Sequence, residues 1–199
     1  MMSAFLGPIH YWMYEKIMVQ EDLLRRIADK AEQEGWLNSA ADYVRDERHP
    51  LEEIIDEANI HGWLSSCIES VETRYAELVA SILTDHEERL DELKAVAYTF
   101  GMEKAAEADS TAGECYKRIE DCTLDGMPCD GVNVVTDKQE GHFSWQQRFD
   151  VHGAYWLAAG GRKEDYYTLR HQFIAGILTT ANYVLTSSGQ GEYSLCRND

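Results

Sequence analysis

The segment from Leu51 to Phe100 constrains the fold most, because its apolar side chains recur with the period of an α-helix over about fifty residues. At about 100° per residue these side chains share one stripe of the helix surface, and they are Ile68, Tyr75, Val79, Ile82, Leu90, Leu93 and Ala97. Four polar side chains lie within about 40° of the centre of that stripe, namely Glu57, His61, Glu72 and His86. A carboxylate or imidazole that faces a core must be paired, hydrogen-bonded or bound to a metal, because burying it alone is costly.

Two arrangements of this segment stay open. Pro50, followed by two glutamates, is typical of a helix N-terminus. Thr84 and Asp85 are residues that cap helices, so the segment forms either one helix or two. If it forms two, the angular alignment of His86 with His61 loses its meaning.

The rest of the chain predicts further helices and one β-hairpin. A helix is expected from about Pro8 to Glu34, because proline suits the first turn of a helix and Gly35 suits the position after its end. The runs 132–136 and 142–149 change to the two-residue period of strands and predict the hairpin. A last helix and a tail are expected after it, at about 164–186 and 189–199.

We therefore predict a mainly α protein: a bundle of about four helices with an inserted β-hairpin before the last helix. Residues 1–199 are expected to form a single domain, since a chain of this length with 44% apolar residues can bury one substantial core. Its parts are the helical bundle part (1–108), an irregular segment with the β-hairpin (109–161), and the C-terminal helix and tail (162–199).

The net charge limits the partners. The formal charge is −18, and no block of lysine and arginine interrupts the acidity, so neither nucleic acid nor an anionic membrane is expected to bind. No stretch reaches the roughly 18–20 apolar residues of a membrane-spanning helix. The N-terminus lacks the features of a secretion signal and the five cysteines are an odd number, so we expect a cytoplasmic protein with reduced thiols.

The polar residues of the helical stripe predict a divalent-metal site. Glu57 and His61 lie one helical turn apart, which is a good spacing for two ligands of one ion. Helical bundles take such ligands from several helices and hold zinc, iron or manganese with them. The candidate ligands are His10, Glu57, His61, Glu72, His86 and His171. The alternative is that these are partly exposed residues beside the stripe, with Glu72 in a salt bridge to an arginine.

A metal-free thiol enzyme is the second hypothesis. Cys129 lies in a loop rich in glycine and proline, where the backbone presents a side chain rigidly. Its activation needs a neighbouring base, for which His142 and His152 are the candidates. Cys115 and Cys122 are interpreted as buried core residues.

Aromatic side chains and one arginine suggest a small-molecule pocket. Trp12, Tyr155 and Trp156 belong to clusters that suit either a pocket wall or the seam between hairpin and bundle. Arg170 falls in the middle of the apolar face of the last helix. A guanidinium there either pairs with Glu72 or Glu57, or it binds an anionic ligand.

The leading functional hypothesis is a helical-bundle protein whose Glu/His metal site acts on or binds a small molecule. The alternatives are the Cys129 enzyme and a non-catalytic ligand-binding or dimerising module. A homodimer is also expected, because Phe143, Trp145 and Phe149 would form an apolar outer face on the hairpin.

Overall fold

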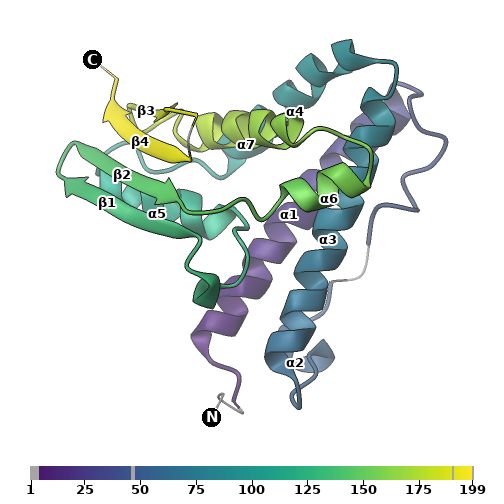
Figure 1. Ribbon diagram of the computed structural model, residues 1–199, viewed down its shortest axis with the longest axis horizontal. Coiled ribbons are helices and arrows are strands. Elements are labelled where there is room, and N and C mark those ends of the chain that lie inside the picture. Colours follow the sequence, from purple (N-terminus) through teal and green to yellow (C-terminus); the bar gives the residue numbers. More distant parts are fainter. Residues whose placement is uncertain (1–4, 46–47, 190, 199) are drawn as a thin grey trace.

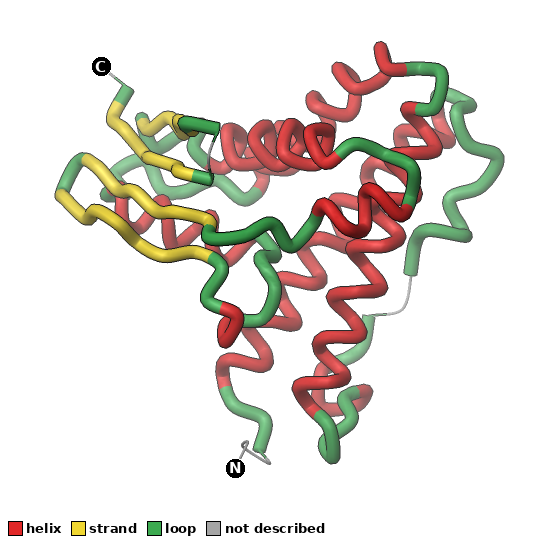
Figure 2. The backbone as a smooth tube through the Cα atoms, viewed as in Figure 1, coloured by secondary structure: helices red, strands yellow, loops and turns green. Residues whose placement is uncertain are grey.

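Helices make up the greater part of the structure, a computed structural model that describes residues 5–45, 48–189 and 191–198 (Figures 1 and 2). The α-helices are α1 (Pro8–Gln33), α2 (Leu51–Ile54), α3 (Ile60–Leu83), α4 (Leu90–Glu103), α5 (Ala112–Cys122), α6 (Gly153–Ala158) and α7 (Lys163–Ile177). Two short 3₁₀ turns are η1 (Glu87–Arg89) and η2 (Pro128–Asp130). The strands are β1 (Asn133–Gln139), β2 (His142–Gln147), β3 (Tyr183–Ser187) and β4 (Glu192–Arg197).

The long helices α1 and α3 pack side by side, and the segment between them returns along the molecule so that both run in the same direction (Figure 1). Pro8 opens α1 as expected, and the chain leaves the helix at Gly35, whose φ of 68° suits glycine. Their apolar stripes meet in the core, where Ile17, Leu24 and Val79 are almost fully buried. None of the described helices is long and apolar enough to cross a bilayer.

The segment 51–100 forms separate helices and not one. Helix α3 ends at Leu83, and Asp85 adopts a φ of 60° before η1 and α4 begin. The turn ends the helical phase, so His86 is exposed and no longer aligned with His61. Of the two arrangements left open by the sequence, the one with a new start near Thr84 is therefore correct.

Helices α4 and α7 approach each other at a pair of glycines. A Cβ atom on Gly176 would lie 2.2 Å from the carbonyl oxygen of Tyr98, and one on Gly101 would lie 2.1 Å from that of Phe173. Both distances are far below van der Waals contact, so only glycine permits this backbone approach. Beside this contact the rings of Phe100 and Phe173 stack at 5.3 Å.

The β-structure is a four-stranded antiparallel sheet in the order β1-β2-β4-β3. The predicted hairpin is its β1–β2 half. The expected helix end at 186 and the tail at 189–199 are wrong, because α7 stops at Ile177 and the chain then forms β3 and β4. The turn before β3 includes Asn182, with a φ of 52°, and β4 pairs with β2. Residues 190 and 199 of that tail lie outside the described residues.

One face of the sheet packs on α5 through aromatic rings. Tyr116 of α5 stacks on Phe143 at 4.3 Å and lies 5.0 Å from Trp145, which stacks on Tyr193 of β4. Phe143 and Trp145 are therefore buried, at 4% and 3% exposure, and only Phe149 of the three is exposed. The expected apolar outer face is wrong for these two residues because α5 covers them, and the homodimer prediction loses that support. The mainly α prediction is confirmed, and the four-helix bundle stays a prediction.

We expect Gly176→Ala to destabilise the protein by about 1–3 kcal/mol or more, because the new methyl group meets backbone that cannot move away alone. Gly113→Ala in α5 is the matched control, since its Cβ would lie 3.8 Å from the nearest side-chain atom. There the better helix propensity of alanine is expected to leave stability unchanged or raise it by up to about 1 kcal/mol. Urea unfolding of both variants measures the difference, and equal effects would contradict the close packing of α4 on α7.

Candidate functional site

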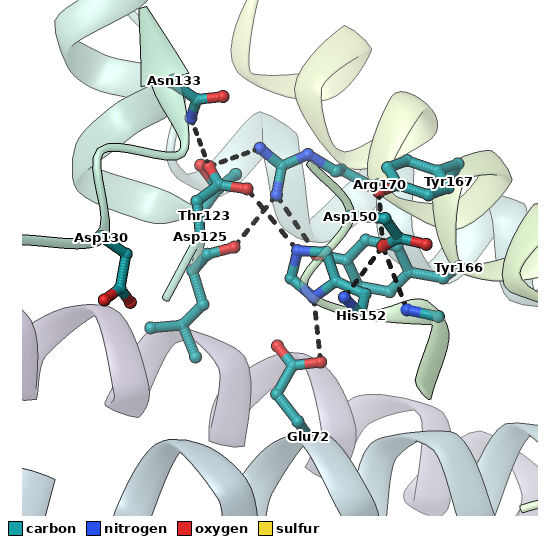
Figure 3. Close-up of polar contacts among 12 residues, drawn as sticks. Glu72, Thr123, Asp125, Asp130, Asn133, Asp150, His152, Tyr166, Tyr167 and Arg170 are labelled. Carbon is teal, nitrogen blue, oxygen red and sulfur yellow. Dashed lines mark hydrogen bonds and ion pairs between the residues drawn. The ribbon is translucent and has the colours of Figure 1, made fainter. Parts of the chain in front are cut away.

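Five side chains form a buried charge network at the centre of the molecule: Glu72, Asp125, His152, Tyr166 and Arg170 (Figure 3). They come from α3, from the loop after α5, from the turn before α6 and from α7. The side chains of Glu72 and His152 are each 2% exposed, and those of Asp125 and Arg170 are 10% and 12% exposed. The network therefore joins segments that are distant in the sequence.

His152 is held through both ring nitrogens. Its Nδ1 lies 3.1 Å from Glu72 Oε2, and its Nε2 lies 2.9 Å from the Tyr166 hydroxyl and 3.5 Å from Asp125 Oδ1. The backbone is fixed as well, because Asp150 Oδ1 accepts hydrogen bonds from the N–H groups of His152 and Gly153 at 2.9 and 3.0 Å. This turn sets the direction in which the imidazole enters the core (Figure 3).

Three hydrogen bonds hold the guanidinium of Arg170 in place. Its Nη2 donates to Asp125 Oδ2 at 2.8 Å, and its Nη1 donates to the Leu124 carbonyl and to the Tyr166 hydroxyl, both at 3.2 Å. Tyr166 and Arg170 are four residues apart on α7, so they project from the same face of the helix. Asn133 donates to the same oxygen of Asp125 at 2.9 Å.

A short turn places Asp125 opposite α7. Helix α5 ends at Cys122, and the chain reverses at Gly126, whose φ of 69° favours glycine. Thr111 precedes α5, and its side chain caps the first turn of the helix together with Glu114. The loop position of Asp125 is thus determined by the end of a well-capped helix and by a glycine turn.

The charges of the network offset one another. Burial lowers the pKa of His152, but the carboxylates of Glu72 and Asp125 outweigh this effect and raise it to about 9. Burial likewise opposes the ionised form of Asp125, whose pKa is nevertheless lowered by Arg170 and His152. Near neutral pH the network therefore contains two carboxylates, an imidazolium and a guanidinium, with no net charge. Such pairing is what makes four buried charges tolerable.

A cavity of about 600 Å³ lies between α7 and the β3–β4 side of the sheet, and we call it the sheet cavity. Arg170 lines it together with Tyr167, Tyr193, Arg148 and Lys163. Its volume falls within the range of roughly 300–1,000 Å³ that small-molecule sites occupy. Arg170 is thus a member of the buried network that also faces an open cavity.

The six residues of the metal hypothesis are not brought together. The rings of His10 and His61 lie 5.5 Å apart, Glu72 is paired with His152, and Glu57 and His86 are exposed. His171 lines the sheet cavity. Over residues 5–45, 48–189 and 191–198, no group of three or more His, Cys, Asp or Glu side chains could hold a metal ion. The candidate ligands stay apart because α3 ends at Leu83, before His86, and because Glu72 is already paired with His152.

The residues of the thiol hypothesis also lie apart. Cys129 is exposed in η2, with its Sγ 4.0 Å from Asp130 Oδ1. His142 contacts Asp137 at 2.9 Å and Ser144 at 3.2 Å, and His152 belongs to the buried network. Neither imidazole contacts Cys129 among the described interactions, and a catalytic role for this cysteine stays a prediction.

The proposed pocket residues separate into three environments. Trp12 donates to Asp121 at 2.6 Å on the α1–α5 side, and Trp156 is fully buried in the core. Tyr155 lines a smaller cavity beside Glu72, whereas Arg170 lines the sheet cavity. The partner of Arg170 is Asp125, not Glu72 or Glu57 as predicted, because Glu72 meets His152 and Glu57 is exposed before α3.

Several site residues were missed by the sequence analysis. Asp125, Asp150, Arg148 and Lys163 lie in loops or at an element end, where hydrophobic periodicity carries no information. The sequence places Tyr166 on the apolar face of the last helix, where its ring is buried, but its hydroxyl lies 2.9 Å from His152 Nε2. The one available signal was its spacing of four residues from Arg170.

We expect Asp125→Asn to destabilise the protein by about 3–5 kcal/mol, because it leaves the buried Arg170 without its carboxylate. The matched control is Asp137→Asn, which removes an aspartate that pairs with His142 at the surface, where both side chains are well exposed. Exposed pairs contribute about 0–1 kcal/mol, so the control is expected to change stability little. Urea unfolding at neutral pH measures both, and a small effect of Asp125→Asn would contradict the proposed charge balance.

The stability of the protein is expected to fall as the pH rises from about 6.5 to about 9. The pKa of His152 is higher in the folded protein than the 6.5 of an unfolded chain, so the folded state keeps a proton that the unfolded state loses. The stabilisation is complete below about 6.5 and is lost as the pH passes about 9. The difference in unfolding free energy between wild type and His152→Gln is expected to shrink over this range. An NMR titration of wild type that places this imidazole near 6.5 would contradict the prediction.

Comparisons with models of known protein families, with curated proteins and with solved structures give no match for this chain. The function therefore has to be inferred from the geometry of the site itself.

Proposed function

We propose that the protein binds a small anionic molecule in the sheet cavity, with Arg170 as the fixed cationic group of the site. This proposal rests on the environment of Arg170. Its guanidinium is held by Asp125 and Tyr166, and the residue also lines a cavity of about 600 Å³. A guanidinium whose geometry is set before binding loses little conformational freedom when it meets a carboxylate or phosphate.

The other charged groups of the cavity support an anionic ligand. Arg148 and Lys163 line it, and neither has an ion-pair partner among the described residues. Two acidic residues, Asp150 and Glu164, also line it. Of these, Asp150 already accepts hydrogen bonds from two backbone N–H groups and from the Tyr167 hydroxyl. The protein has a formal charge of −18 and repels anions over most of its surface. The cations Arg148 and Lys163 make this cavity a place where an anion is attracted instead.

The walls of the cavity favour a ligand with an aromatic or apolar part. Tyr167 and Tyr193 present rings that can stack, while Ile174 and Leu185 supply apolar contact. The lining thus combines rings and aliphatic side chains with several charged and polar groups, so it can contact both parts of such a ligand. The proposal keeps the small molecule of the sequence hypothesis. It does not rely on a zinc, iron or manganese ion, since no cluster of ligands assembles among the described residues.

Binding of benzoate and phenyl phosphate, measured by calorimetry or by NMR, tests this proposal. Arg148→Met and Lys163→Met are each expected to weaken binding about five- to tenfold, because each removes one charge from the cavity. Lys138→Met is the matched control, since Lys138 is exposed on β1 and does not line the cavity. Equal affinity of all variants, or equal binding of uncharged benzyl alcohol, would contradict an anion-binding site.

A further inference from the structure

A second cavity, of about 270 Å³, lies between α3, the loop with η2, and α6. We call it the α3 cavity, and it shares no lining residue with the sheet cavity. Its walls combine the apolar side chains of Ile68, Met127 and Val151 with the ring of Tyr155. The volume is slightly below the usual range of ligand sites, so only a compact molecule fits.

The polar groups of this cavity are mainly acidic. Glu72 and Asp130 both line it, whereas no lysine or arginine does among the residues that the structure describes. Of these lining residues only His152 is cationic, and it is already paired with Glu72 Oε2 at 3.1 Å. Burial raises the pKa of Tyr155, and the carboxylates of Glu72 and Glu69 raise it further, so the local field is negative.

One oxygen of Glu72 lacks a partner. Its Oε2 meets His152, but its Oε1 is buried and has no hydrogen-bond partner among the described residues. In Figure 3 one oxygen of Glu72 is joined to His152 by a dashed line and the other has none. A buried carboxylate oxygen without a donor is costly, and a bound hydrogen-bond donor would remove that cost. The side chain is 2% exposed, so water does not solvate it freely.

We propose that the α3 cavity binds a small organic cation, namely a compact ammonium compound with an apolar body. Its N–H groups donate to Glu72 Oε1 and to the carboxylate of Asp130, which the turn of η2 fixes through a hydrogen bond from Met127 N–H at 2.8 Å. The apolar body contacts Ile68 and Met127, and the ring of Tyr155 adds attraction between cation and π-electrons. This second site is independent of the anion site in the sheet cavity.

The test compares three probes of the same shape: benzylammonium, benzyl alcohol and benzoate. Benzylammonium is expected to bind at neutral pH and to shift NMR signals of α3, η2 and α6, while the alcohol and the carboxylate leave these signals unchanged. Benzoate tests the anion site in the sheet cavity. If one of the two proposed sites binds no ligand, the result for the other site can still be interpreted. Equal binding of benzylammonium and benzyl alcohol, or shifts confined to the sheet cavity, would overturn the proposal.

Two substitutions outside the buried network locate the site. Asp130→Asn is expected to weaken benzylammonium binding at least tenfold while it keeps the acceptor for Met127 N–H. Ser65→Phe places a large side chain at the exposed cavity wall and is expected to abolish binding. Glu72→Gln is expected to weaken binding too, but it also alters the contact with His152. Glu77→Gln, exposed on the same helix, is the matched control. Unchanged affinity in both Asp130→Asn and Ser65→Phe would overturn the assignment.

Discussion

The rest of the structure depends on the pairing of four buried charges, those of Glu72, Asp125, His152 and Arg170 (Figure 3). Each belongs to a different segment, so the pairing connects α3, the loop after α5, the turn before α6 and α7. Removing one leaves another uncompensated in the core, which costs far more than losing a pair at the surface. Both cavities adjoin this network, and each inherits a fixed charged group from it: Arg170 in one, Glu72 in the other.

The sequence predicted the parts of the fold that local patterns determine. Helix α1 was found because proline and glycine mark its ends, and the β1–β2 hairpin because the apolar period changes there. Strand β3 was missed because Ala181 and Val184 continue the helical phase of α7 by chance. What makes that segment a strand is pairing with β4 and, through it, with β2, which no local pattern reports.

The candidate site was predicted only as separate residues. Glu72 and Arg170 were identified from the sequence because ionisable groups on apolar faces need an explanation, and His152 was identified as a candidate base for Cys129. Their partners were assigned wrongly, since Asp125 lies in a loop and its distance from α7 depends on how α5 ends. The metal hypothesis placed His61 and His86 on one helix, and the turn at Asp85 separates them.

The glycine contact between α4 and α7 has a consequence for recognition. Backbones in direct contact cannot slide past each other without a clash, so the end of α7 at Gly176 is fixed against α4. The wall of the sheet cavity that carries Arg170 belongs to this fixed helix, whereas the facing wall includes residues of the edge strand β3 and of its neighbour β4. If the sheet cavity binds the proposed anion, we therefore expect the walls to adjust to it in β3 and β4 and not in α7.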